Sequence, residues 1–354
     1  MSSPHDIHLE PSTPGGCVSP VVHPWGHSAV QATSVLSSEP QPQLFFLGKP
    51  ARLRILILGG SGFISGNLAR RAVQAGHQVT IVTRGRRPVP EGVEALQADR
   101  SQPGELNNTM SDWALKQPKP LRPFDLVVDC LAWTPEHIRQ DLALFCGTEQ
   151  THLVVLSTDQ VYDPKRRTFP QTNEPAAYLE DQSDFAGKRR CEQLLMQQDT
   201  TRRWTVLRPS IVLGANGRLD FFPEHLHDDD VVGRLRRGEE LRLAGGGHFL
   251  CQPIYVGDLA ELILAFPATP GAAGKILDCP GPETLEIRQV YELAAKTLGG
   301  SLSIAEIPIA QRLETHPEEA PWLCHRFYPH GPLRLSGLPV PHISPECALR
   351  EQLA

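Results

Sequence analysis

The chain has 354 residues, of which 33 are proline and 29 are glycine, and its 34 basic and 40 acidic side chains give a formal net charge of −6. This acidic balance provides no overall positive field for a polyanion, so we expect no nucleic-acid partner. No apolar run approaches the ~18 residues that a membrane span needs. We therefore expect a cytoplasmic protein without a membrane association.

The first fifty residues differ in composition from the rest of the chain. They contain eight prolines, ten serines or threonines and only four charged side chains. Such a segment cannot bury enough apolar surface to offset the entropy of ordering, so we expect residues 1–50 to form a disordered extension. Organellar targeting is the alternative for a Ser-rich, acid-poor segment, although the first arginine is Arg52.

Neither the cysteines nor the histidines form a pattern typical of a metal site. The eight cysteines are widely spaced without a CxxC pair, and we expect reduced thiols. His225 and His227, with the aspartates at 228–230, are the densest group of metal-ligating residue types. This group follows Pro223 and precedes a polar stretch, which favours a solvated loop, so we expect no bound metal.

A strand-turn-helix pattern begins after Arg52. Residues 53–58 read LRILIL, an apolar run typical of a strand buried on both faces of a parallel sheet. The turn GGSGFISG follows at 59–66, then a helical pattern that ends at Gly76 and a second apolar strand at 77–83. A glycine turn at this place presents backbone N–H groups at a helix N-terminus, which suits a pyrophosphate. The sequence therefore predicts a dinucleotide-binding βαβ unit.

The residues that follow the second strand bear on the choice of dinucleotide. They read Arg84-Gly85-Arg86-Arg87, without an acidic residue. An acidic side chain at this point favours the ribose hydroxyls of NAD, whereas an arginine accommodates the 2′-phosphate of NADP. We therefore favour NADP(H) over NAD(H), and a loop that is basic by chance is the alternative.

Further strand-like runs alternate with helical stretches along the chain. They lie at 93–98, 126–131, 152–157, 205–207 and 275–279. Strands that alternate with helices over this length predict an α/β fold with a doubly wound parallel sheet, the Rossmann arrangement.

Five motifs occur in the order found in one protein family. They are GGSGFI at 59–64, DLVVDCLA at 125–132, LSTDQVY at 156–162, RPSIVLG at 208–214 and PIYVGDLA at 253–260. With them the chain resembles, over residues 52–350, the NAD-dependent epimerase/dehydratase group of the extended short-chain dehydrogenase/reductase superfamily. The basic exit from the second strand is most similar to a branch with bacterial reductase-like proteins and chloroplast stem-loop-binding proteins.

The resemblance implies a set of cofactor-binding residues. Arg84 would meet the adenosine ribose or its phosphate, and Asp99 would bond the adenine amino group or, alternatively, only cap a loop. Leu131 and Ala132 would lie beneath the cofactor. Ser65 stands where the family has its third glycine, and Gly66 follows one position later. The residues implied at the pyrophosphate are Gly59, Gly60, Ser61, Gly62, Phe63 and Ile64.

The resemblance also implies a catalytic pair, and here the chain departs from the family. Family members use Tyr-x-x-x-Lys, in which the lysine lowers the pKa of the phenol and binds the nicotinamide ribose, while a nearby hydroxyl shares the hydrogen bond. Thr158 matches the hydroxyl and Lys188 matches the lysine. Asp184 stands at the tyrosine position, and the adjacent Phe185 has no hydroxyl. The candidate catalytic residues are therefore Thr158, Lys188 and Asp184.

Two functions fit this departure. In the first, the chain is an NAD(P)-dependent oxidoreductase or epimerase-like enzyme with altered proton transfer, acting on a sugar nucleotide or a small carbonyl or hydroxyl compound. In the second, it is a catalytically inactive NADP(H)-binding sensor, scaffold or RNA-associated protein. Loss of a positioned general acid costs roughly 10²–10⁴ in rate. The retained Thr158 and Lys188 favour the enzyme.

The resemblance further implies how the chain is divided. A Rossmann domain would occupy 51–212, with 251–280 returning to its sheet, and a smaller C-terminal lobe at 213–350 would bind a small-molecule substrate. Many relatives pair through two helices, so we also consider a homodimer. Arginines of the lobe could face an anionic substrate, or form an exposed helix face with the neighbouring glutamates. They are Arg234, Arg236, Arg237 and Arg242.

Overall fold

A computed structural model of the protein describes residues 52–147, 149–198, 203–219, 222 and 230–354. The extension expected to be disordered, residues 1–50, lies outside the described residues, as do the two histidines of the sequence-based ligand group, His225 and His227. Contacts group residues 51–354 into one unit.

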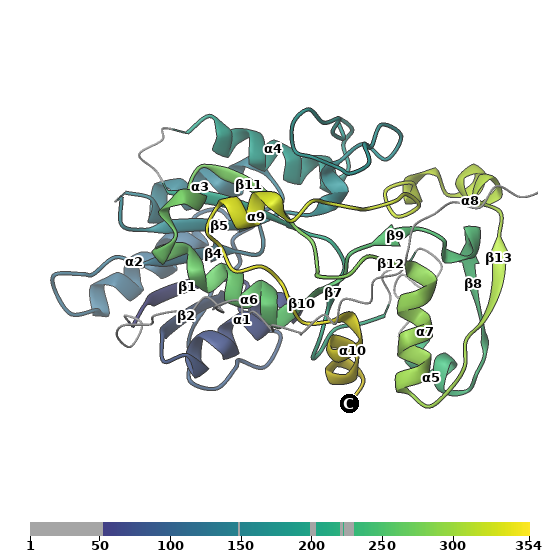
Figure 1. Ribbon diagram of the computed structural model, residues 1–354. Helices are drawn as coiled ribbons and strands as arrows, with labels where there is room; N and C mark the ends of the chain where they lie inside the picture. Colours follow the sequence, from purple (N-terminus) through teal and green to yellow (C-terminus); the bar gives the residue numbers. More distant parts are fainter. Residues whose placement is uncertain (1–51, 148, 199–202, 220–221, 223–229) are drawn as a thin grey trace, which may run out of the picture. The chain divides into compact units, whose positions relative to one another are not determined.

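Seven parallel strands form the main sheet, in the order β11-β6-β5-β4-β1-β2-β3. Each predicted strand is present within two residues of its expected bounds, so the doubly wound parallel sheet is confirmed. The strand order reverses between β1 and β4, the place where open α/β sheets bind their ligands. The strands are β1 (Arg54–Leu58), β2 (Gln78–Thr83), β3 (Glu94–Gln97), β4 (Leu126–Asp129), β5 (His152–Leu156), β6 (Trp204–Pro209) and β11 (Lys275–Cys279) (Figure 1).

Helices cover both faces of the sheet. Ile55 and Ile57 of β1 pack in one buried cluster with α1 and α6, whereas Leu56 and Leu58 pack in another with α2, α3 and α4. Because both faces are covered, the strand is apolar at every position instead of alternating with polar residues. The helices are α1 (Phe63–Gln74), α2 (Glu105–Lys116), α3 (Pro135–Phe145), α4 (Asp184–Met196) and α6 (Val256–Ala265) (Figure 1).

A second hydrophobic core is built by residues between 211 and 353. Helix α7 (Ile287–Thr297) contributes buried residues at the spacing of one helix face, among them Ile287, Val290 and Tyr291. The other elements of this region are three strand pairs, β7 (Val212–Leu213) with β10 (Ile254–Tyr255), β9 (Leu250–Cys251) with β12 (Leu285–Glu286) and β8 (Glu240–Ala244) with β13 (Ser303–Ile307), and the helices α5 (Val231–Arg236), α8 (Ile309–Thr315) and α10 (Pro345–Leu353).

Two later segments pack with the main sheet. Strand β11 pairs with β6, and helix α9 (Gly331–Leu335) places Leu333 in the cluster that also contains Ile55 and Ile57. In the described part of the chain, no helix combines the length and apolar character that a membrane span requires.

Candidate functional site

A cavity of about 890 Å³ opens where the central strands end. Its wall comes from residues that follow β1 to β6, together with α1 and α4. Parallel strands end at the same edge of a sheet, and this brings together residues that are far apart in the sequence. Gly60, Ala132 and Asp184 are not among the lining residues. The candidate residues that do line it are Gly59, Ser61, Gly62, Phe63, Ile64, Arg84, Asp99, Leu131, Thr158 and Lys188.

The glycine turn packs closely against β2. Gly60 has a φ of +45°, and a Cβ at this position would lie 2.3 Å from the Cβ of Ile81, which is fully buried. Gly59 has a φ of +117° and donates its N–H to the carbonyl of Val82 at 2.8 Å. Close packing against Ile81 therefore explains why position 60 is a glycine. Gly59 packs beside Leu131 and also lines the cavity.

Ser65, at the position of the family's third glycine, forms a local hydrogen bond. The N–H of Gly62 donates to Ser65 Oγ at 3.0 Å, and Ser65 is buried. This bond uses one N–H at the N-terminus of α1 that a phosphate could otherwise accept from. The N–H groups of Phe63 and Ile64, at the first two positions of α1, have no acceptor within the helix, and both residues line the cavity.

Three exposed arginines and one aspartate line the cavity near β2 and β3. Arg84, Arg86 and Arg87 are exposed and follow β2. Asp99 follows β3, and its Oδ1 accepts hydrogen bonds from Ser101 N–H at 3.0 Å and Ser101 Oγ at 2.6 Å. These bonds to Ser101 lower the pKa of Asp99. Asp99 therefore lines the cavity and also caps the turn that follows it.

A buried charge cluster, which the sequence analysis missed, supports the same wall. Arg100 lines the cavity, and its guanidinium donates to Asp129 at 2.5 Å and to Asp141 at 2.8 Å. Burial and the neighbouring Asp129 carboxylate raise the pKa of Asp141 well above its usual range. Asp129 Oδ1 also accepts the N–H of Leu131 at 2.6 Å, which fixes the loop after β4. Asp129, a charged residue at the end of the apolar run in the motif DLVVDCLA, was the one feature of the sequence that could have indicated this cluster.

Lys188 on α4 lies buried between the ends of β4 and β5. Its Nζ donates to the carbonyl oxygens of Ala132 at 3.1 Å and Leu156 at 2.9 Å. The ring centroid of Trp133 lies 4.1 Å from Nζ, so the ammonium also has a cation–π contact. Burial lowers the pKa of Lys188. Ala132 thus contributes its carbonyl to the lysine, and its own side chain is buried.

Thr158 and Asp184 differ in their placement. Thr158 Oγ1 accepts the N–H of Gln160 at 3.3 Å, which leaves the hydroxyl proton for a second acceptor. Asp184 is the first residue of α4 and is exposed, whereas the adjacent Phe185 lines the cavity and packs edge-on against Trp322. The structure therefore brings Thr158 and Lys188 to one cavity and leaves Asp184 outside its wall.

No tyrosine is among the residues of the described chain that line this cavity. The hydroxyl of Tyr162 lies 2.9 Å from Asp278 Oδ2 and accepts from Arg208 Nη1 at 2.8 Å. Burial raises the pKa of Tyr162, so this phenol is unsuited to proton exchange. The hydroxyl of Tyr178 donates to the carbonyl of Asn173 at 2.7 Å. Both tyrosines belong to a buried polar network.

The same network holds α4 to the sheet. Glu192, four residues after Lys188, is fully buried and accepts from Arg208 Nε at 2.9 Å and Nη2 at 2.5 Å. The hydroxyl of Ser157 donates to Glu192 Oε1 at 2.6 Å. Arg208 lies on β6 and Ser157 follows β5, so Glu192 fixes the helix that carries Lys188 against two strands.

A second cavity of about 740 Å³ adjoins the first. Thr158 and Arg87 are among the residues that line both. Asp159 is the acidic residue in its wall, and Trp322 is an aromatic one. Its basic residues are Arg70, Arg87, Arg218 and Arg326.

The four arginines considered either as contacts of an anionic substrate or as an exposed helix face lie outside both cavities. Neither Arg234 nor Arg236, Arg237 or Arg242 lines either cavity. Arg237 pairs with Asp230 at 2.8 Å and Glu239 at 2.6 Å. The arginines that do line the second cavity come from α1, the β2 exit, the loop after β7 and the segment before α9, so no local pattern indicated them.

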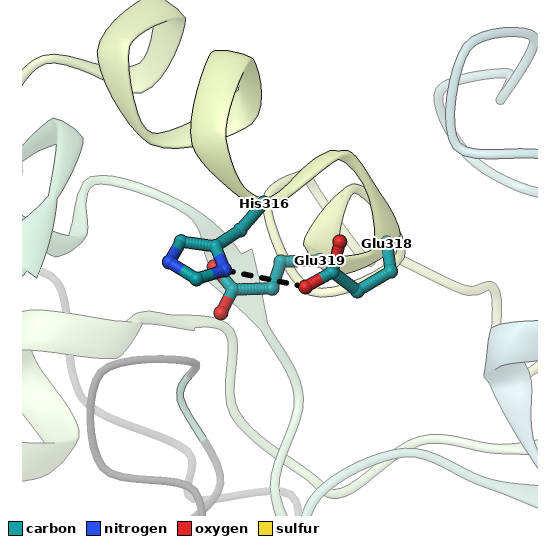
Figure 2. A group of neighbouring side chains, drawn as sticks. All are labelled: His316, Glu318 and Glu319. Carbon is teal, nitrogen blue, oxygen red and sulfur yellow. Dashed lines mark hydrogen bonds and ion pairs between the residues drawn. The ribbon is translucent and has the colours of Figure 1, made fainter.

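Figure 2 shows one group of metal-ligating residue types in the described chain, with ligand atoms within 4.8 Å of one another. It consists of His316, Glu318 and Glu319. Both oxygens of Glu319 already accept from Arg312, each at 2.6 Å, and His316 Nδ1 lies 3.3 Å from Glu318. The arginine neutralises the most buried carboxylate, so the group does not suit a cation.

Comparison with known proteins identifies relatives of this arrangement. The chain is 25% identical over 269 residues to the chloroplast stem-loop binding protein of 41 kDa b from Arabidopsis thaliana, across 72% of this chain and 65% of that protein, just under two thirds of its length. It is 24% identical over 272 residues to the 2′-dehydrokanamycin reductase of Streptomyces kanamyceticus, across 74% of this chain and 72% of that protein.

A solved structure shares the fold, and a family profile matches the sequence. The UDP-glucose 4-epimerase of Thermotoga maritima, solved with UDP-glucose, superposes with a TM-score of 0.64 at 16% identity, covering 85% of this chain and 97% of that one. The profile of the NAD dependent epimerase/dehydratase family matches residues 55–118 and 136–278. These segments make up more than half of the chain, which therefore belongs to the NAD dependent epimerase/dehydratase family.

Proposed function

We propose that the chain binds NADP(H) in the larger cavity and converts a small sugar-derived molecule in the adjoining one, as an oxidoreductase or epimerase-like enzyme with altered proton transfer. One observation carries this proposal. Thr158 lines both cavities, and Lys188 is buried on the same wall of the larger one. A hydroxyl where two cavities join can meet a cofactor on one side and a substrate on the other.

The shape and charge of the larger cavity fit a dinucleotide. The glycine turn lies between Asp99 and the arginines after β2 on one side and Lys188 and Thr158 on the other. The family binds NAD(P) nucleotides. NADP(H) is the choice because arginines, and no acidic residue, directly follow β2.

The chain's own groups would manage the proton. Bound NADP(H) supplies the hydride acceptor or donor. Thr158 Oγ1 accepts the backbone N–H of Gln160 with one lone pair and can still donate its own proton to a substrate oxygen. The Lys188 ammonium, held by two carbonyls, places a positive charge on the same wall, which favours negative charge on that oxygen. Asp184 takes part only if the helix end moves, because its side chain is exposed.

The nature of the substrate is inferred from relatives. One relative is named as a reductase of a kanamycin derivative, and one structural neighbour was solved with UDP-glucose. Both compounds carry sugar rings with hydroxyl or carbonyl groups. We therefore propose a sugar nucleotide or a related small carbonyl or hydroxyl compound as the substrate.

A second candidate function rests on the missing phenol. Within the described chain no tyrosine lines either cavity, and the Lys188 ammonium is engaged by two carbonyls and the Trp133 ring. These contacts suit a protein that binds NADP(H) as a sensor or scaffold without turnover. An RNA-associated role has only the name of one relative in its favour.

A binding and turnover experiment separates the two functions. NADPH and NADH are titrated into the full chain by nucleotide fluorescence, and turnover is screened on sugar nucleotides and keto sugars with the wild type, Thr158→Val, Lys188→Met and Asp184→Tyr. The enzyme proposal predicts NADPH-dependent turnover that falls at least about 100-fold in Thr158→Val. Tight NADPH binding without turnover, and none gained in Asp184→Tyr, would establish the inactive alternative. Absence of NADPH and NADH binding would overturn both.

A further inference from the structure

An aromatic ring covers the part of the Lys188 ammonium that no carbonyl holds. An ammonium has three N–H groups, and Lys188 donates two of them to the carbonyls of Ala132 and Leu156. The ring centroid of Trp133 lies 4.1 Å from Nζ, so the ring occupies the space beside the third N–H. Trp133 and Lys188 both line the larger cavity. An oxygen of a bound molecule can therefore reach this ammonium only if it takes the place of the ring.

The backbone of Trp133 is firmly fixed. Its N–H donates to Nδ1 of His137 at 3.2 Å. Its carbonyl oxygen lies so close to α4 that a Cβ at Gly187 would approach it to 2.6 Å. The preceding residue, Ala132, is buried, and its carbonyl accepts from Lys188. Movement at this position is therefore confined to the side-chain torsions.

The indole side chain is free to rotate. Trp133 is 41% exposed, whereas Trp113 and Trp204 are buried in the core. Rotation of an exposed side chain is fast and leaves no void in the core. The ring can therefore leave Lys188, chiefly at the cost of the cation–π contact.

We infer that Trp133 is a movable cover over Lys188, and that binding of NADP(H) turns its ring away from the ammonium. The inference rests on the proposed function, because it assigns the larger cavity to the nucleotide. Arg84 and Asp99, which suit the adenosine half, follow β2 and β3 on one side of β1, whereas Trp133 and Lys188 belong to the loop after β4 and to α4. The cover therefore acts on the nicotinamide half of the nucleotide, and the adenosine half binds without moving it.

The experiment compares whole and half nucleotides on the full chain. NADP⁺, NAD⁺ and 2′,5′-ADP, which represents the adenosine half of NADP⁺, are titrated by calorimetry into the wild type, Trp133→Phe and Trp133→Leu. The same titrations with Lys188→Met, and with Trp133→Leu in the Lys188→Met background, ask whether the effect passes through the lysine. Phe169→Leu, at an exposed aromatic residue outside both cavities, is the matched control. Circular dichroism melts check that each variant is folded.

Removal of the cover should strengthen the binding of the whole dinucleotide. Trp133→Leu should bind NADP⁺ roughly 3- to 30-fold more tightly, which is the cation–π contact converted to an affinity ratio. Trp133→Phe should gain less, because a phenyl ring attracts a cation more weakly than an indole does. Binding of 2′,5′-ADP should be unchanged in both variants, and Phe169→Leu should bind as the wild type does. In the Lys188→Met background, Trp133→Leu should bring no gain.

Indole fluorescence follows the ring itself. NADP⁺ is the probe because, unlike NADPH, it does not take up the emission of every nearby tryptophan. Saturating NADP⁺ should change the emission of the wild type, since the indole of Trp133 loses the adjacent charge, and 2′,5′-ADP should leave the emission unchanged. Most of the change should be absent in Trp133→Phe.

Several outcomes would overturn the inference. They are equal NADP⁺ binding by the wild type and Trp133→Leu, an equal gain for 2′,5′-ADP, a gain that persists in the Lys188→Met background, and an emission change that is as large in Trp133→Phe. Weaker NADP⁺ binding by Trp133→Leu would overturn it as well, because the ring would then be part of the nucleotide site. If Trp133→Leu does not fold, the comparison of Trp133→Phe with the wild type decides.

Failure of the inference is distinguishable from failure of the proposed function. NADP⁺ binding that does not depend on Trp133 leaves the proposed function standing. Binding of either nucleotide that tightens in Trp133→Leu, without turnover of any substrate, keeps the cover and removes the enzyme. No binding of NADP⁺ or NAD⁺ by the wild type and by Trp133→Leu would overturn both.

Discussion

Gly60 offers the sharpest test of the reasoning about the glycine turn. A Cβ at this position would lie 2.3 Å from Cβ, 2.5 Å from Cγ2 and 2.9 Å from Cδ1 of Ile81. Ile81 is fully buried in β2 and pairs with Ile57, so it has no room to withdraw. The φ of +45° adds a further cost for any residue with a Cβ.

We expect Gly60→Ala to reduce the free energy of unfolding by about 2–5 kcal/mol, from overpacking and the left-handed backbone together. For a folded part of about 300 residues the melting temperature should fall by roughly 3–8 °C. Because Gly60 does not line the cavity, the loss of NADPH affinity in the folded fraction should be the smaller effect. Guanidinium unfolding and NADPH fluorescence titration measure the two quantities.

Gly66→Ala is the matched control. A Cβ there meets its nearest neighbour, Nη1 of Arg70, at 3.7 Å, which is ordinary contact, and Gly66 lies inside α1. Helix propensity predicts a gain of up to about 1 kcal/mol in the free energy of unfolding. Equal stabilities of Gly60→Ala and Gly66→Ala would refute the packing argument. A Gly60→Ala protein with normal stability but no NADPH binding would show instead that Gly60 belongs to the cofactor site.

Three further changes test the cavity and the core. Ser65→Ala should release the N–H of Gly62 and tighten NADPH binding roughly three- to tenfold, and no gain in calorimetry would show that this N–H does not face the cofactor. Arg84→Gln should weaken NADPH about tenfold and leave NADH unchanged, relative to Arg139→Gln on α3; equal loss of both nucleotides would remove the 2′-phosphate assignment. In the folded chain, burial lowers the pKa of His152 to about 3. Below pH ~6.5 the unfolded chain therefore binds a proton at His152 that the folded chain does not bind. The free energy of unfolding should then fall by about 1.4 kcal/mol per pH unit between pH ~6.5 and pH ~3. Urea unfolding at several pH values should show a flatter acid dependence for His152→Gln, and identical slopes would contradict the assignment.

Local patterns allowed much of the fold to be predicted. Residues close together in the sequence determine an apolar strand, a glycine turn and a periodic helix. Strands β1 and β2 each begin one residue after their predicted start, and α1 ends two residues before the predicted Gly76. Thr158 and Lys188 could also be placed together from the sequence, because Thr158 directly follows the end of β5 and Lys188 lies near the start of α4, the next helix of this alternating fold. Asp184 was chosen by spacing alone, and spacing does not determine exposure.

The missed residues depend on contacts between distant segments. Arg100 is explained only by Asp129 and Asp141, which come from two later elements. Arg326 Nη1 lies 3.9 Å from Asp159 Oδ2 although the two residues are more than 160 positions apart in the sequence, and no sequence motif connects them. The arginines considered as substrate contacts lie in one short stretch, residues 234–242, whereas the arginines of the second cavity come from four separate segments.

The anchoring of α4 by Glu192 has a consequence for how this chain can change its chemistry. Residues 184, 188 and 192 are spaced by four and share one face of the helix. Glu192 is tied to two strands, Lys188 to two carbonyls, and position 184 is exposed at the first turn. Position 184 can therefore exchange one functional group for another without loss of the scaffold, although its neighbours Ala186 and Gly187 in the same turn are buried.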